Sequence, residues 1–173
     1  VEIAEVFDSV VGESPAVPVR VYVPQPGVAC DVVLFVHGGG HMAGDLDVYD
    51  ASARRTAAAT GMVVVSVDYR RSPEALFPEG LTDTYRALHH LTDALEGVAT
   101  TGRVHGVADS GGAAKLASIA MRVAGGEWTS PLERQVLIYP SLDYTMSGES
   151  VREYGAGFFL SAERVKWYFD HYF

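Results

Sequence analysis

Four continuous apolar runs constrain the fold of this chain more than any other feature of its sequence. They read VVLFV, MVVVSV, VHGVA and QVLIY and lie at residues 32–36, 62–67, 104–108 and 135–139. A strand that is buried on both faces needs no polar residue at alternate positions, and such strands are typical of parallel sheets with helices on both sides. The runs therefore predict a mostly parallel, doubly wound α/β sheet.

The segments around these runs fit the same architecture. Residues 3–10 and 17–23 flank the turn signal GESP and predict an antiparallel pair of strands. Alanine-rich or amphipathic spacing, with Gly61 after the first segment, predicts helices at residues 51–60, 81–95, 115–123 and 162–173. No repeat, low-complexity tract or linker interrupts the chain, so we expect one domain over residues 1–173.

Charge and cysteine content exclude several classes of partner. The net charge is −9 and the basic residues are scattered, which argues against a nucleic acid or an anionic membrane surface as partner. A small, neutral ligand fits better.

Cys30 is the only cysteine, so no intramolecular disulfide is expected and a reducing compartment, the cytoplasm, is the simplest location. The sequence contains neither a membrane-length apolar stretch nor a signal-peptide pattern in residues 1–20.

The third run ends in a motif that points to nucleophilic catalysis. In sheets of this kind, ligands bind beyond the carboxyl ends of the strands. There the sequence ADSGG places Ser110 between a strand and a helix, with small residues at positions 108, 111 and 112. A nucleophile on a tight strand-to-helix turn needs such neighbours, and it predicts a positive φ at Ser110. The same letters also fit an ordinary turn that is capped by an Asp or a Ser.

The first run ends in HGGGH, a loop almost without side chains. Glycines 38 to 40 leave their backbone N–H groups bare, and fixed donors of this kind stabilise the oxyanion that forms when a serine attacks an ester. The N–H of Gly111, at the positive end of the helix after Ser110, adds another donor.

Two other interpretations of this loop fit less well. The spacing Gly38-x-Gly40-x-x-Ala43 matches a dinucleotide fingerprint, but the sequence GDLD follows where a helix should begin. His37 and His41 have the spacing of metal ligands on a helix, but three intervening glycines disfavour a helix there. No metal or other cofactor is therefore expected.

The motifs HGGG, VDYRRSPE, ADSGG, QVLIYPSLDY and GFFLSAERVKWYFDHYF, in this order, resemble the hormone-sensitive-lipase-like family of α/β-hydrolases, many of them bacterial carboxylesterases. The resemblance implies a partial α/β-hydrolase fold with about six of the eight core strands of that fold. It also implies a serine carboxylesterase that hydrolyses small to medium acyl esters through an acyl-enzyme. Ser110 would be the nucleophile, His37 would brace the loop, and the oxyanion donors would be Gly38, Gly39, Gly40 and Gly111.

The resemblance has departures. Ala108 stands where the family usually has Gly, and Gly111 stands where the family often has Ala. The family order is Ser, then Asp, then His, and only His171 follows Ser110 in this chain. Asp170 cannot orient its neighbour, because adjacent residues on a helix point in different directions. We therefore expect an incomplete catalytic domain that lacks the triad Asp and His and the family's N-terminal cap, and that is inactive by itself.

A non-catalytic small-molecule-binding protein on the same fold is the alternative function.

The resemblance further implies a cis peptide at Ser72–Pro73, at Phe77–Pro78 or at both, and loop-bracing roles for Tyr69, Arg70 and Glu74. The aromatic residues 167–173 are expected to lie beside the pocket. The strand at 135–139 is expected to be an apolar sheet edge, covered by further chain or by a second copy in a homodimer.

Overall fold

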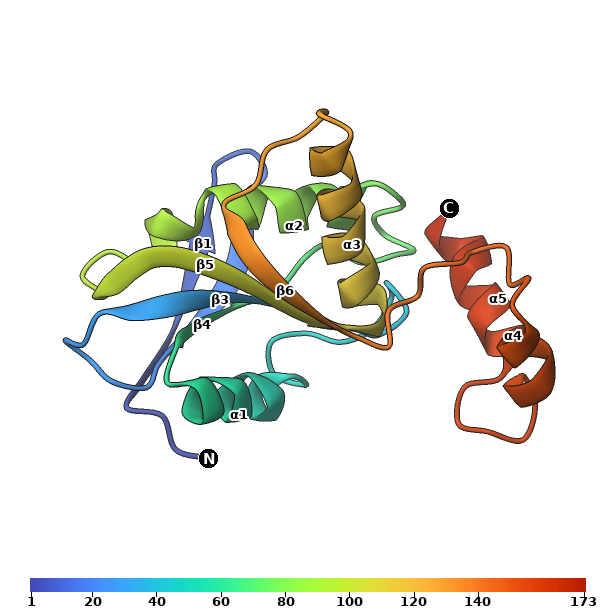
Figure 1. Ribbon diagram of the computed structural model, residues 1–173, viewed down its shortest axis with the longest axis horizontal. Coiled ribbons are helices and arrows are strands. Elements are labelled where there is room, and N and C mark those ends of the chain that lie inside the picture. Colours follow the sequence, from blue (N-terminus) through green and yellow to red (C-terminus); the bar gives the residue numbers. More distant parts are fainter.

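One six-stranded sheet runs through the computed structural model, which describes residues 1–173 (Figure 1). The strands lie in the order β1-β2-β4-β3-β5-β6. β2 pairs antiparallel with β1 and with β4, and all other pairings are parallel. The predicted mostly parallel sheet is thus confirmed. The strands are β1 (Glu5–Val11), β2 (Val17–Val23), β3 (Cys30–Val36), β4 (Val63–Val67), β5 (Thr100–Asp109) and β6 (Leu132–Ile138).

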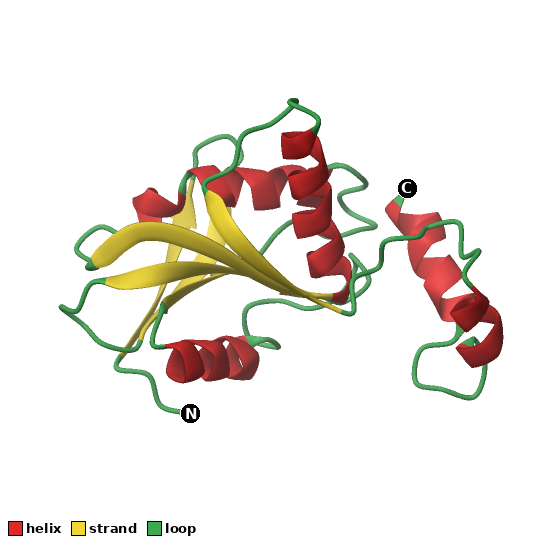
Figure 2. Ribbon diagram, viewed as in Figure 1, coloured by secondary structure: helices red, strands yellow, loops and turns green.

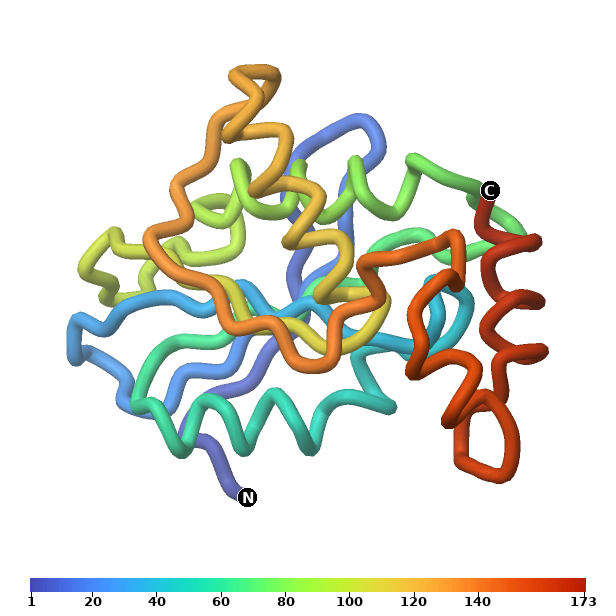
Figure 3. Tube along the Cα trace, turned by 45° about the vertical axis from the view of Figure 1, so that its right-hand side comes forward, coloured from blue at the N-terminus to red at the C-terminus, as the bar shows by residue number.

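Helices cover both faces of this sheet (Figure 2). The helix α1 (Asp50–Thr60) lies on one face, and α2 (Glu79–His89) and α3 (Ser110–Ala124) lie on the other. Two further helices, α4 (Glu149–Tyr154) and α5 (Ala162–Tyr172), lie beyond the carboxyl ends of the parallel strands. The tube view shows the same placement at the right of the molecule (Figure 3). No helix is long and apolar enough to cross a membrane.

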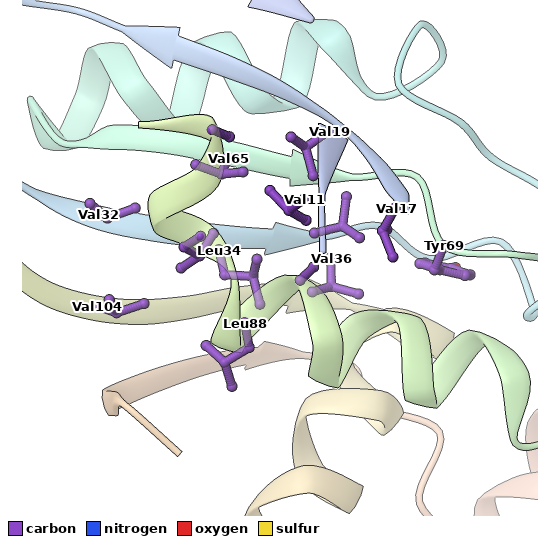
Figure 4. Close-up of a cluster of buried hydrophobic side chains, with 14 of the residues drawn as sticks. Val11, Val17, Val19, Val32, Leu34, Val36, Val65, Tyr69, Leu88 and Val104 are labelled. Atoms are coloured by element: carbon purple, nitrogen blue, oxygen red, sulfur yellow. The ribbon is translucent and has the colours of Figure 1, made fainter. Parts of the chain in front are cut away.

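The central strands are apolar throughout because their side chains are buried in two layers. Leu34 and Val36 of β3 belong to the larger core cluster, which packs against α2 and α3 and includes Leu88 (Figure 4). The alternate residues Val33 and Phe35 pack on the opposite face with two alanines of α1. Burial on both faces accounts for the runs without polar interruption.

One helical prediction needs correction, and one short helix was not predicted. The single helix predicted at 81–95 is α2 followed by a separate 3₁₀ turn, η1 (Leu91–Ala94). The break at His90 brings Asp93 to the N-terminal hairpin, where its carboxylate accepts a hydrogen bond from the Gly12 N–H at 3.0 Å. The sequence did not predict α4, which has six residues and buries none of them, so that it shows no apolar periodicity.

Two further structural expectations, on the cis peptides and on the sheet edge, are met. Both Ser72–Pro73 and Phe77–Pro78 are cis. β6 is the edge strand beside β5, and its Val136 and Ile138 are 56% and 42% exposed. The sheet therefore presents an apolar edge on that side.

Candidate active site

Ser110 lies on a turn with no intervening loop, because β5 ends at Asp109 and α3 begins at Ser110. Its φ is +47°, which confirms the predicted strained conformation. The small neighbours are required by close packing: a Cβ at Gly112 would lie 2.2 Å from the carbonyl oxygen of Val36, where no side chain fits. This is the geometry of a nucleophile elbow, in which the serine hydroxyl is lifted above the sheet.

The glycine loop after β3 is a tight turn that lies beside the elbow. Gly39 has a φ of +109°, and a Cβ there would lie 2.0 Å from the carbonyl oxygen of Ala43. The Gly39 carbonyl accepts hydrogen bonds from the N–H groups of Met42 and Ala43, which closes the turn. Only glycine fits this position.

Three backbone donors of the predicted oxyanion set are free. The N–H groups of Gly39 and Gly40 have no hydrogen-bond partner in the structure, and that of Gly111 lies in the first turn of α3, where no intrahelical acceptor exists. Gly38 is different, because its N–H donates to Oδ1 of Asp109 at 2.8 Å. The inclusion of Gly38 among the oxyanion donors is therefore corrected: it anchors the loop instead.

A buried aromatic stack supports the loop from below. The Nδ1 atom of His37 lies 2.8 Å from the Gly38 carbonyl oxygen, and its ring stacks on Tyr69 at 4.4 Å between centroids. The Tyr69 hydroxyl donates to the His37 carbonyl oxygen at 2.8 Å. Burial lowers the pKa of His37 to about 4, so the ring is neutral near pH 7. The bracing roles expected of His37 and Tyr69 follow from these contacts.

Ser110 and the free donors open into one cavity of about 640 Å³. Its outer wall is largely aromatic and comes from the segment that contains α5. Tyr168 lies directly over Gly40, since a Cβ at Gly40 would lie 2.9 Å from its ring. Aromatic residues of the C-terminal segment thus lie beside the pocket, as expected. The apolar and aromatic lining residues are Tyr49, Tyr139, Phe159, Leu160, Val165, Tyr168 and Phe169.

No histidine of the chain is placed to take the proton of Ser110. None of the hydrogen bonds in the structure joins a histidine ring to the Ser110 hydroxyl. His41 lines the cavity, but both its ring nitrogens are engaged, by Lys115 Nζ at 2.8 Å and by the Tyr144 hydroxyl at 3.3 Å. His171 lies outside the cavity lining, with Nδ1 2.7 Å from the Trp167 carbonyl oxygen. The structure therefore brings Ser110 together with the free N–H groups of Gly39, Gly40 and Gly111, and no histidine ring is hydrogen-bonded to Ser110.

Sequence reasoning did not assign a function to Asp109 or to Lys115. Asp109 holds Gly38, and its Oδ2 accepts a hydrogen bond from the Tyr49 hydroxyl at 3.1 Å. Its place directly before the nucleophile was a usable signal. Lys115 is one of only two lysines and stands in an otherwise small and apolar helix, and that contrast was the available signal.

Comparison with known proteins places this geometry in a family. A family model described as alpha/beta hydrolase fold matches residues 33–173. The chain is 32% identical over 159 residues to an ethyl acetate hydrolase of Pseudomonas putida, covering 90% of this chain and 50% of that protein. It is 35% identical over 174 residues to the carboxylic ester hydrolase LipN of Mycobacterium tuberculosis, covering 95% of this chain and 45% of LipN.

A solved structure shows the same likeness in three dimensions. An esterase of Pyrobaculum calidifontis superposes with a TM-score of 0.88 at 34% identity, covering 99% of this chain and 58% of the esterase. The chain thus spans about half the length of the curated relatives that it matches.

Proposed function

Because this chain belongs to the hormone-sensitive-lipase-like family of α/β hydrolases, we propose that it is the nucleophile-bearing part of a serine carboxylesterase. The single observation that supports this most strongly is Ser110 at φ +47° on the elbow, in one cavity with the free N–H groups of Gly39, Gly40 and Gly111. These are the groups that an acyl transfer needs in one place.

The proposed reaction runs through an acyl-enzyme. The Ser110 oxygen attacks the acyl carbon of the ester as its proton passes to a base, and the carbonyl oxygen becomes an oxyanion. The three free N–H groups stabilise that oxyanion. The base then protonates the leaving alcohol, and a water molecule, activated by the same base, hydrolyses the acyl-enzyme.

We assign the base and its acid partner to chain outside residues 1–173. The contacts of His41 and His171 support this assignment, since both rings are engaged away from Ser110. The relatives, which are about twice as long, have room for such residues.

The substrate we propose is a neutral ester with a small to medium acyl group. The apolar, aromatic lining of the cavity supports this class, because it offers no cationic side chain to an anionic substrate. The names of the relatives, ethyl acetate hydrolase and carboxylic ester hydrolase, point the same way.

We propose that the apolar edge at Val136 and Ile138 is covered in the intact protein, by further chain or by a second copy. Light scattering of the full-length protein distinguishes a monomer from a homodimer. The cytoplasmic location stays a prediction.

Turnover of p-nitrophenyl esters by the full-length protein tests the proposed function. The wild-type protein should hydrolyse acetate and butyrate esters, and Ser110→Ala should lose about 10³-fold or more in kcat. Ser118→Ala is a matched control, because that serine lies two turns further along α3 and its hydroxyl bonds only to the Ala114 carbonyl. A wild-type protein that binds such esters without Ser110-dependent turnover would favour the non-catalytic alternative.

A further inference from the structure

Gly111 and Lys115 stand four residues apart on α3 and therefore face the same neighbour. That neighbour is His41, which follows the glycine loop directly. A Cβ at Gly111 would lie 3.1 Å from both the backbone nitrogen and Cε1 of His41. Lys115 Nζ lies 2.8 Å from His41 Nδ1. Gly111 thus leaves room for the His41 imidazole, and Lys115 binds it.

Lys115 is buried without a carboxylate. Its residue is 2% exposed, and no salt bridge in the structure includes it. Its Nζ lies 4.0 Å from the ring centroid of Tyr69 and 5.6 Å from that of Tyr172. Apart from these two cation–π contacts, the Lys115 amine has only its hydrogen bond to His41. Burial lowers the pKa of Lys115 to about 7. A buried amine with so few partners is costly, so its contact with His41 calls for a functional reason.

The His41 ring is neutral and contacts Lys115, Tyr144 and Tyr172. Burial and the nearby Lys115 lower its pKa to about 2, so it accepts a hydrogen bond from Lys115 at Nδ1. Its Nε2–H then points to the Tyr144 hydroxyl at 3.3 Å. The ring stacks on Tyr172 of α5 at 3.8 Å with an angle of 8° between the planes. Its backbone has a φ of +67°, in the left-handed region that is uncommon for residues other than glycine.

We propose that Lys115 is a positioning residue for the oxyanion donors. Through its hydrogen bond to His41 it holds the glycine loop, with the N–H groups of Gly39 and Gly40, against the start of α3, where the Gly111 N–H lies. The role in turnover rests on the proposed function of Ser110. The proposal also accounts for glycine at position 111, since an alanine Cβ there would lie 3.1 Å from the His41 ring and backbone nitrogen, so that His41 would have to shift by a few tenths of an ångström.

Lys115→Met in the full-length protein tests this directly. Methionine fills the same apolar slot but cannot donate to His41. Oxyanion donors act in the transition state, so kcat should fall about 10-fold while KM stays within about 2-fold. Hydrogen–deuterium exchange at residues 38–43 should become several-fold faster. Lys166→Met is the matched control, because Lys166 is an exposed lysine that pairs only with Asp170, and it should change neither quantity.

A second variant separates positioning from folding. His41→Phe combined with Lys115→Met keeps an aromatic ring against Gly111 and Tyr172 and removes both buried polar side chains of the pair together. The Tyr144 hydroxyl, which loses its contact with position 41, is only partly buried. This double variant should fold as stably as the wild type and still lose about 10-fold in kcat. Wild-type kcat in a folded double variant would overturn the positioning role.

The exchange measurement keeps this inference separate from the proposed function. If Ser110→Ala turns over esters as fast as the wild type, the proposed function fails, and loop exchange alone then decides whether Lys115 holds the loop. Exchange at residues 38–43 that is unchanged in Lys115→Met overturns the inference, whatever the activity. Faster exchange together with the selective loss of kcat supports it.

Discussion

The backbone N–H of Gly38 donates to the carboxylate of Asp109 at 2.8 Å, so the residue before the proposed nucleophile holds the first glycine of the loop after β3. This hydrogen bond joins the carboxyl ends of β3 and β5, which are neighbours in the sheet. The other carboxylate oxygen accepts a hydrogen bond from the Tyr49 hydroxyl at 3.1 Å. The Asp109 carboxylate is therefore one of the groups that fix the glycine loop relative to Ser110.

Replacing Asp109 should impair turnover more than binding. In Asp109→Ala the Gly38 N–H loses its acceptor and the loop loosens, so kcat should fall by about 10- to 100-fold with KM little changed. Asp109→Asn keeps an amide oxygen at the same place and should retain more of kcat. Steady-state kinetics on p-nitrophenyl butyrate measures both. Equal losses in the two variants would show that charge, not the hydrogen bond, is what matters.

Gly39→Ala should abolish most activity for a steric reason. Its Cβ would meet the Ala43 carbonyl at 2.0 Å, so the turn must open and the Gly39 and Gly40 donors must move. We expect a loss of about 100-fold or more in kcat. Gly61→Ala is the control, because Gly61 also has positive φ, +69°, but has nothing within 4 Å of an added Cβ. It should cost about 1 kcal/mol in the free energy of unfolding and leave kcat unchanged.

Much of this site follows from the sequence because each motif has one dominant physical requirement. Small residues around Ser110 indicate a turn in which no Cβ fits, and the structure shows that turn at φ +47°. The three glycines indicate exposed backbone donors. The sequence could not predict which of these N–H groups are free. The hydrogen bond that occupies the Gly38 N–H is accepted by Asp109, which lies 71 positions further along the chain.

The surroundings of Lys115 were unpredictable for the same reason. A lone lysine in a helix is normally placed on the solvent side. Here its side chain is buried by contacts from His41, Tyr69 and Tyr172, which come from three separate segments. The 3₁₀ turn after His90 likewise depends on the distant bond between Asp93 and Gly12.

The buried Lys115 should make stability depend on pH. Burial lowers its pKa from the ordinary value of 10.5 to about 7 in the folded state. Below pH 7 folded and unfolded chains both carry the proton, so the penalty of burying the charge is fully present. Between pH 7 and about 10.4 the unfolded chain binds more protons, and stability from this group rises with pH by about 1 kcal/mol per unit.

Urea denaturation of the wild type and Lys115→Met at pH 7 and pH 9.5 isolates this contribution. The variant lacks the titrating group, so its free energy of unfolding relative to that of the wild type should be higher at pH 7 than at pH 9.5. Taking the difference cancels the groups that the two proteins share. A difference that stays constant with pH would mean that Lys115 titrates normally.

The 173-residue chain made by itself should be nearly inactive. It has Ser110 and the oxyanion donors but no base within reach, so its turnover of p-nitrophenyl acetate should barely exceed that of its own Ser110→Ala variant. The full-length protein should be faster by several orders of magnitude. Strong Ser110-dependent turnover by the 173-residue chain would mean that His41 or His171 leaves its present hydrogen bonds and acts as the base.

Covalent trapping tests the central claim most directly, because it identifies the attacking atom. The full-length protein is treated with a p-nitrophenyl alkylphosphonate ester, whose phosphorus is attacked by the nucleophile with loss of p-nitrophenolate and whose phosphoryl oxygen occupies the oxyanion site. Mass spectrometry of the digested protein then locates the adduct. We expect one phosphonyl group per chain, on Ser110, and none after Ser110→Ala. An adduct on another residue, or none on a protein that still hydrolyses esters, would contradict it.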